Sequence, residues 1–158
     1  MFQVGDKVVY PMHGAGIIEA IEEKEVLGQI RKYYVMRLPI GDMKIMVPIS
    51  NVQEIGLRQV IDSKSVDLVF SILGDRSNTM TASWNRRYRA NLDKMRSGNI
   101  FEVAEVVKNL VLREKDKGLS TGEKKMLENA RQILISELVL AGNRKEAEVI
   151  SLIQGVLA

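Results

Sequence analysis

The period of the hydrophobic pattern changes once along this chain, near Gly56, and that change constrains the fold more than any other feature. Up to about Ile55, apolar and polar side chains alternate over short runs, as in strands that bury one face. From Leu57 onward, apolar residues recur at every third or fourth position, the spacing of amphipathic helices. The pattern therefore predicts an α+β protein of two domains, a β domain over residues 1–56 and an all-α helical bundle over residues 57–158.

The β half is short for the number of strands it carries. About four or five strand-like runs fit into roughly 55 residues, which predicts a small, strongly bent sheet or barrel of the SH3/Tudor type. In residues 44–49, strand periodicity places Ile45, Val47 and Ile49 inward and Lys44, Met46 and Pro48 outward. Pro48 lacks a backbone N–H, so its strand is expected at a sheet edge, where a partner's strand can pair with it.

Helix start and stop signals punctuate the second half. Asn99 with Glu102, and Ser120 with Glu123, have the spacing of capping boxes that open two helices. Stop signals follow the helical stretches at Gly74, Gly118 and Gly142-Asn143. The short loops between these stretches predict a compact bundle.

Catalytic chemistry has few candidate residues, because the chain contains no cysteine and one histidine, His13. Disulfides, thiolate metal sites, cysteine nucleophiles and histidine-pair metal sites are therefore excluded. Residues 10–16, which include His13 and two glycines, are expected to form a turn between strands, since the third glycine and the following helix of a dinucleotide fingerprint are missing. We expect no enzymatic activity, no cofactor, no metal and no small-molecule substrate.

Composition also bears on location. No apolar run approaches the roughly 20 residues needed to cross a bilayer, and the start of the chain lacks the basic and apolar regions of a signal peptide. Together with the absence of cysteine, these features predict a cytoplasmic protein without a membrane partner.

The positive charge of the chain is concentrated in one short segment. The formal net charge is +3, but residues 76–96 hold six Lys and Arg against one acidic residue, Asp93. Such a cluster is expected where a protein contacts phosphates, although a solvated helix face accounts for the charge equally well.

Within this segment, Trp84 has two possible roles. Ser83 is a plausible N-cap, which puts Trp84 in the first turn of a helix, where its indole can wedge beside a base. Trp84, Tyr88, Leu92 and Met95 also follow helical spacing, and spacing alone favours an indole that anchors a core. A tryptophan at the rim can pack one edge and expose the other.

The sequence resembles the CarD/CdnL family of bacterial RNA polymerase-binding transcription regulators. Val4–Pro11 with His13-Gly14 is similar to the family's opening, which also resembles the polymerase-interacting domain of transcription-repair coupling factors. Trp84–Asn91 is similar to its DNA-contacting stretch, and Gly118–Lys124 and Ala130–Leu134 to its later helices. The resemblance covers essentially the whole chain.

The resemblance implies a Tudor-like domain that binds the RNA polymerase β subunit and a helical domain that touches promoter DNA upstream of the −10 element. It implies that Trp84 enters the minor groove at the edge of the melted region and prolongs the life of the open complex. Residues expected to contact the DNA backbone are Arg86, Arg87 and Arg89, with Arg76 added from the charged segment. Mostly phosphate contacts imply weak sequence preference. Polymerase binding implies association with the nucleoid.

The expected polymerase contacts are Lys24, Met46 and Pro48. Lys24 matches a basic position of the family's polymerase-binding face. Met46 stands where other members have an arginine, so the contact there is expected to be apolar.

Two other functions fit the residues. One is an adaptor that binds polymerase or a repair factor and uses its helical domain for protein contacts alone. The other is a general RNA- or DNA-binding module, which predicts salt-sensitive binding to nucleic acid without polymerase.

Overall fold

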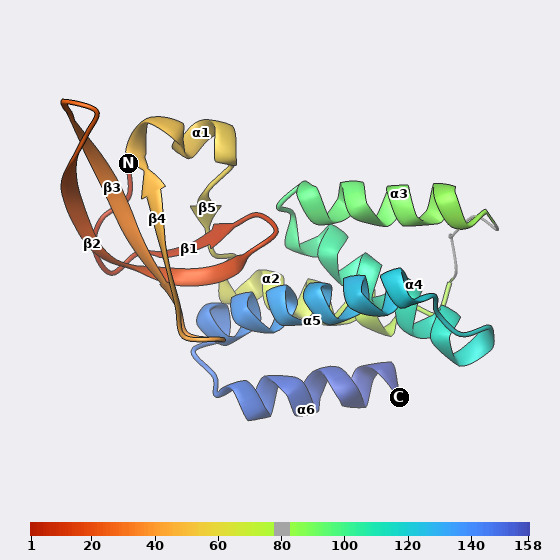
Figure 1. The fold of residues 1–158 in the computed structure, drawn as a ribbon. Coiled ribbons are helices and arrows are strands. Elements are labelled where there is room, and N and C mark those ends of the chain that lie inside the picture. The colour runs from red at the N-terminus through yellow and green to blue at the C-terminus, as the bar shows by residue number, and fades with distance from the viewer. Residues whose placement is uncertain (78–82) are drawn as a thin grey trace.

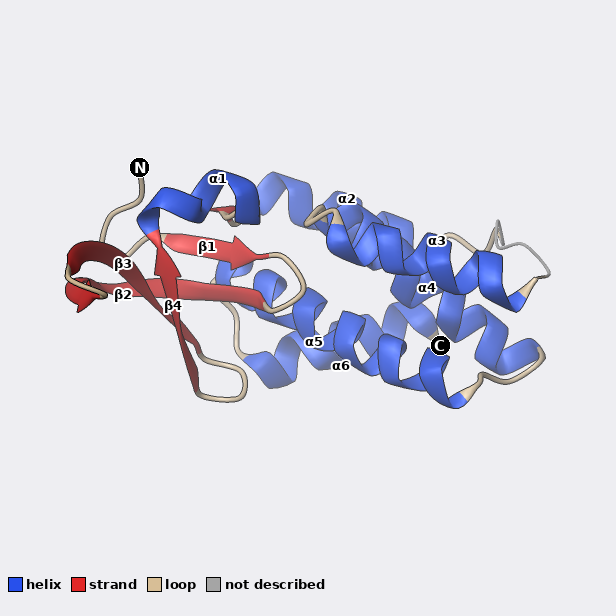
Figure 2. Ribbon diagram, turned by 45° about the horizontal axis from the view of Figure 1, so that its top comes forward, coloured by secondary structure: helices blue, strands red, loops and turns tan. Residues whose placement is uncertain are grey.

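A computed structural model describes residues 1–77 and 83–158. The chain forms a five-stranded antiparallel sheet followed by a bundle of helices (Figure 1), which confirms the predicted α+β class. The strands are β1 (Lys7–Tyr10), β2 (Gly14–Val26), β3 (Gln29–Leu38), β4 (Met43–Pro48) and β5 (Arg58–Gln59). The helical elements are the 3-10 turn η1 (Ile49–Asn51) and helices α1 (Val52–Ile55), α2 (Ser63–Gly74), α3 (Trp84–Arg96), α4 (Ile100–Asp116), α5 (Thr121–Gly142) and α6 (Glu146–Leu157). Figure 2 shows the sheet at one end of an elongated molecule, with the long helices extending away from it.

The sheet runs in the order β4-β3-β2-β1-β5, and its central element is the long, twisted β2–β3 hairpin (Figure 1). The short strand β5 returns to pair with β1, where Val8 faces Gln59 and Val9 faces Arg58. The sheet therefore continues to Gln59, a few residues past the domain boundary expected at Gly56. The division of the chain into two domains at that residue stays a prediction.

Strand β4 is an edge strand, as the proline in it predicts. Its side chains alternate as expected, because Val47 is fully buried and Met46 keeps 37% of its surface exposed. Pro48 ends the strand opposite Tyr33 of β3. The alternation follows from a core on one side of the sheet, which is lined by Val8, Ile18, Tyr34, Met36, Leu38, Val47 and Leu57.

The helical half packs around α4 and α5, and its boundaries lie close to the predicted signals. Ser120 and Glu123 form a complete capping box at the start of α5. Asn99 caps α4 by accepting a hydrogen bond from the Phe101 N–H. Helix α5 stops at Asn143, whose φ of 51° is left-handed. In residues 1–77 and 83–158, no helix is both long and apolar enough to cross a membrane.

The sheet is fixed to the side of α5 by buried polar contacts. The Ala15 N–H donates to Ser136 Oγ (2.9 Å), and a Cβ at Gly14 would lie 2.8 Å from that oxygen. Glu137 is fully buried and accepts two hydrogen bonds of 2.7 Å from the Arg58 guanidinium. Residues 11–13 form the expected turn between β1 and β2. The two glycines follow it at the start of β2, where Gly14 permits the close contact with α5.

Candidate nucleic-acid interface

Trp84 is the first residue of α3 and has Ser83 as its N-cap, as the sequence predicts. Its side chain keeps 44% of its surface exposed. The indole stacks on the Tyr88 ring, with centroids 5.1 Å apart and planes 17° apart. It thus packs partly against the protein and presents the remainder to solvent.

The stripe that begins with Trp84 becomes more buried along α3. Tyr88 and Leu92 are half-buried, and Met95 is 1% exposed. The core role that spacing alone favours is therefore right for Met95, at the far end of the stripe, and wrong for the indole. The difference arises because the end of α3 packs on the bundle while its first turn lies at the rim.

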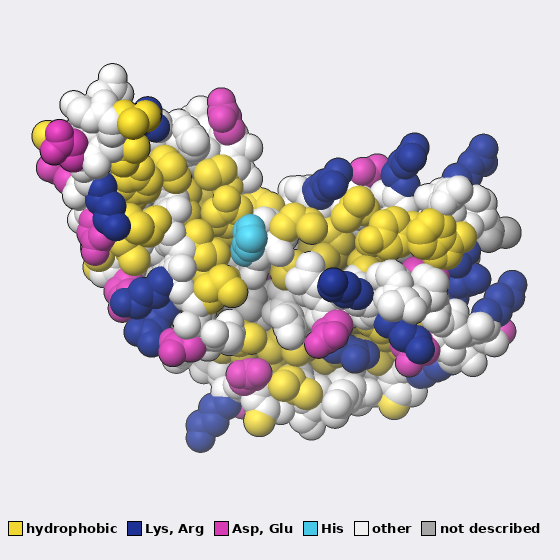
Figure 3. Space-filling view, in the orientation of Figure 1, with side chains coloured by type: hydrophobic (Ala, Val, Ile, Leu, Met, Phe, Trp, Pro, Cys, Tyr) yellow, Lys and Arg dark blue, Asp and Glu magenta, His cyan; other side chains and the backbone are white. Residues whose placement is uncertain are grey.

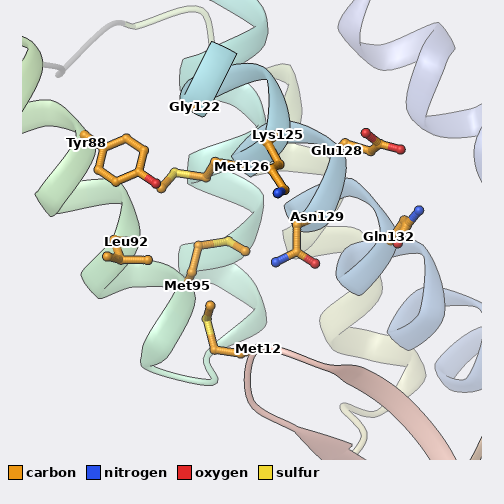
Figure 4. A pocket seen from close by; sticks show the side chains of 10 residues that line it. All are labelled: Met12, Tyr88, Leu92, Met95, Gly122, Lys125, Met126, Glu128, Asn129 and Gln132. Atoms are coloured by element: carbon orange, nitrogen blue, oxygen red, sulfur yellow. The ribbon is translucent and has the colours of Figure 1, made fainter. Parts of the chain in front are cut away.

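Below this stripe, a groove of about 420 Å³ separates α3 from α5. Figure 4 shows Tyr88, Leu92 and Met95 along one wall and Lys125 and Asn129 on α5 along the other. Lys125 is exposed at the groove and lies at the beginning of the second turn of α5. Sequence reasoning missed it, because nothing local shows that the start of α5 lies beside the start of α3.

Arg86 and Arg89 are exposed in the first two turns of α3. At 3.6 residues per turn, their side chains leave the helix on the side away from the Trp84 stripe. Figure 3 shows a band of hydrophobic side chains over α3 and the groove, with Lys and Arg side chains on both sides of the band. Exposed basic residues therefore lie both on α3, which begins with the indole, and across the groove on α5, at Lys125.

Arg87 is buried, unlike Arg86 and Arg89, so the expectation that it contacts the DNA backbone is wrong. It is 5% exposed, and its guanidinium donates to both oxygens of Glu123, at 2.8 and 3.1 Å. Glu123 itself is 1% exposed. Because Arg87 faces the interior, it is not presented to a DNA backbone with Arg86 and Arg89, and its role is to join α3 to the first turn of α5.

The Arg87–Glu123 pair also sets the protonation of the carboxyl. Hydrogen bonds from the Arg87 guanidinium lower the pKa of Glu123 below its ordinary value, against the opposing effect of burial. The N–H and the hydroxyl of Ser120 also hydrogen-bond to the carboxylate and act in the same direction. Glu123 therefore stays ionised inside the domain at neutral pH.

Arg76 lies away from α3. Its guanidinium donates to the backbone carbonyl oxygens of Val156 (3.2 Å) and Ala158 (2.7 Å), at the end of α6. The charged segment of the sequence is therefore divided in space, with Arg76 at the end of α6 and the other basic residues along α3.

The expected polymerase contacts lie on the sheet. Lys24 is exposed near the end of the β2–β3 hairpin and faces Arg31. Met46 and Pro48 lie on the edge strand β4. Because paired residues and alternate residues of a strand point to the same side, the register puts Lys24, Met46 and Pro48 on one face, opposite the core.

Comparison with known proteins identifies both halves of the chain. Residues 68–154 match the family model described as the CarD C-terminal domain, and residues 2–61 match the model described as the CarD-like/TRCF RID domain. A Bacillus subtilis (strain 168) protein, "Putative transcription factor YdeB", is 44% identical over 149 residues, which cover 94% of this chain and 97% of that protein. The solution NMR structure of the N-terminal domain of Myxococcus xanthus CarD is 41% identical, covers 37% of this chain and 79% of that one, and superposes with a TM-score of 0.33.

Proposed function

Because the chain belongs to the CarD family of transcription regulators, we propose that it regulates transcription initiation by joining RNA polymerase to promoter DNA. Its β domain, residues 1–56, binds the polymerase β subunit. Its helical domain, residues 57–158, binds promoter DNA upstream of the −10 element. The two together stabilise the open complex without catalysing a reaction or using a cofactor, and the protein is held at the nucleoid through polymerase.

The observation that carries the proposal is the half-exposed Trp84 indole in the first turn of α3, the helix that also carries the exposed Arg86 and Arg89. An apolar side chain that enters the minor groove at the edge of the melted region separates base steps and opposes reclosure of the duplex. A wedge that binds the open state better than the closed one shifts their equilibrium by the difference in affinity. No energy source is needed.

The proposal assigns the exposed basic residues to the two strands that border a minor groove. Arg86 and Arg89 lie on the outer side of α3, and Lys125 lies on the groove side. An indole inserted into a minor groove about 6 Å wide has a phosphate backbone on each side. These residues position the protein by phosphate contacts, which carry little sequence information.

The proposed contact with polymerase is the face of the sheet opposite the core, beyond the part where Val9 and Ala15 pack against Leu140 of α5. Lys24, Met46 and Pro48 share that face, and β4 offers an unpaired strand edge. A strand of the β subunit can pair with this edge while Met46 provides an adaptable apolar contact. The ion pair between Arg58 of β5 and the fully buried Glu137 of α5 joins this sheet to the helical domain.

Truncation of the indole tests the proposal. With promoter DNA and polymerase, Trp84→Ala should shorten the lifetime of the open complex by about fivefold or more, since stacking of an aromatic side chain on a base is worth about 1–3 kcal/mol. Leu152→Ala is a matched control, because Leu152 is an apolar side chain of similar exposure, 39%, on α6. A folded Trp84→Ala protein that binds polymerase and preserves the lifetime would overturn the wedge.

A second candidate is an adaptor for polymerase or a repair factor whose helical domain contacts protein. The groove between α3 and α5 favours it, because Met12, Met95 and Met126 give it an adaptable apolar lining. Footprinting separates the two functions. An adaptor leaves the polymerase footprint on the promoter unchanged, whereas a DNA-binding regulator extends protection just upstream of the −10 element.

A further inference from the structure

The single polar atom of the Trp84 indole is already bonded within the protein. Its Nε1–H donates to Ser120 Oγ across 3.0 Å. One face of the ring lies on Tyr88. The exposed part of the side chain is therefore hydrocarbon and π surface, without a free donor.

Ser120 is itself held in one orientation. Its hydroxyl donates to Glu123 Oε1 (3.1 Å) and accepts from the Glu123 N–H (3.2 Å), as the N-cap of α5. A serine hydroxyl has one proton and two lone pairs, so the indole N–H takes the last position. Because the Glu123 carboxylate attracts the hydroxyl proton, the oxygen presents a lone pair to Trp84.

The carboxylate is fixed in turn by Arg87, whose Nε donates to Oε2 across 2.8 Å. Arg87 and Glu123 are both at least 95% buried. A continuous chain of hydrogen bonds thus runs from the interior of the domain to the indole at its rim. It passes from Arg87 through Glu123 and Ser120 to Trp84.

We propose that Ser120 is a positioning residue that holds Trp84 as a rigid, purely apolar wedge. The inference rests on the proposed function of Trp84. With its N–H bonded to Ser120, the indole keeps one rotamer and offers no donor to the acceptors at the floor of the minor groove. The wedge then acts on any base step, and promoter preference comes from how easily a step unstacks. Without Ser120 the indole rotates and loses part of the order that DNA binding uses.

The single tryptophan of the chain makes the first test direct. One indole Nε1–H resonance is expected in a ¹⁵N-correlated NMR spectrum of the full chain. Ser120→Ala should shift that resonance and accelerate its exchange with water by about 2- to 10-fold, the range of a net hydrogen bond. Ser120→Thr, which keeps a hydroxyl, should restore both. An unchanged exchange rate in Ser120→Ala would overturn the proposal.

Loss of the helix cap needs its own control. Asp62→Ala removes the N-cap of α2, where Asp62 accepts from the Ser65 N–H, and does not touch Trp84. It should leave the indole resonance in place. If Ser120→Ala fails to fold, Ser120→Gly removes the oxygen but keeps most of the capping effect. A shift of the indole resonance in Asp62→Ala as large as in Ser120→Ala would also count against positioning.

The functional test uses the open complex with polymerase. Ser120→Ala should shorten its lifetime by about 2- to 10-fold, Ser120→Thr should restore it, and Asp62→Ala should leave it unchanged. Trp84→Ala is the reference. If Trp84→Ala has no effect, the proposed function fails. If Trp84→Ala shortens the lifetime and Ser120→Ala does not, the wedge stands and the positioning role fails.

Discussion

Arg87 Nε lies 2.8 Å from Glu123 Oε2 in the interior of the helical domain, although the two residues are 36 positions apart in the sequence. Both side chains are at least 95% buried, and the guanidinium contacts both carboxylate oxygens. The pair connects the first turns of α3 and α5. The position of Trp84 depends on it, because Ser120 bonds to both Glu123 and the indole.

Removal of either partner should therefore make the helical domain less stable to unfolding. Arg87→Ala leaves the Glu123 carboxylate buried without its cation, which is expected to lower the free energy of unfolding by about 3–5 kcal/mol. Urea denaturation followed by circular dichroism measures the loss. Arg89→Ala, on the exposed side of the same helix, should cost no more than about 0.5 kcal/mol. Equal stabilities of the two variants would contradict the buried pair.

The lowered pKa of Glu123 makes part of the stability depend on pH. Hydrogen bonds from Arg87 favour the ionised carboxylate in the folded state, so the stabilisation is present above the ordinary pKa of 4.5 and is lost as the pH falls below it. As the pH falls, the Glu123 carboxylate is protonated at a higher pH in the unfolded chain than in the folded protein, which favours unfolding. In Glu123→Gln, the fall in unfolding free energy from pH 5 downward should be shallower than in the unchanged protein. Parallel curves would show that Glu123 does not contribute.

The sequence predicts the local features of this fold and misses those that depend on distant contacts. A few neighbouring residues are enough to predict the alternation around Val47, the capping box at Ser120 and the end of α5 at Asn143. Burial of Arg87 is not, because it requires Glu123 from another helix. Its spacing with the buried Met95, eight residues later, is a weak signal that one arginine of the cluster faces inward.

The candidate site shows the same limit. Helical spacing places Trp84 in line with Met95 but does not tell where along the stripe the core ends. That position is set by α5, which reaches the first turn of α3 through Ser120. The basic residue Lys125 was missed for the same reason, since its place beside Tyr88 is a tertiary contact.

Close contact between the sheet and α5 predicts a cost for a methyl group at Gly14. Gly14 has a φ of +111°, and a Cβ there would lie 2.8 Å from Ser136 Oγ. Gly28 also has a positive φ, +78°, but a Cβ there meets nothing within 4 Å. Gly14→Ala should therefore destabilise the protein by more than Gly28→Ala, for which backbone strain alone costs about 1–3 kcal/mol. Thermal unfolding of the two variants makes the comparison. Equal losses would mean that Ser136 yields to the added methyl group.

Phosphate contacts predict how DNA binding depends on salt. Arg89→Ala or Lys125→Ala should each reduce the slope of log binding constant against log salt concentration by about 1. Affinity should fall similarly on promoters of different sequence. Lys64→Ala is the control, because Lys64 is an exposed cation at the start of α2. The slopes are measured by titration of the polymerase–promoter complex with the protein at several salt concentrations. If Arg89→Ala and Lys64→Ala changed the slope equally, Arg89 on α3 would not be a specific phosphate contact.

The register of the sheet predicts which side of β4 meets polymerase. Met46 lies on the outer face with Lys24, whereas Met43, three residues earlier on the same strand, belongs by alternation to the opposite face. Both methionines are exposed, at 37% and 53%. A charge buried in an interface loses its hydration without a partner, so Met46→Glu should weaken binding to the β subunit by about tenfold or more. Met43→Glu should bind as the unchanged protein does, because it places the same charge on the strand but away from the contact. Surface plasmon resonance on the immobilised β subunit distinguishes the two. Greater weakening by Met43→Glu than by Met46→Glu would assign the contact to the other face of the strand.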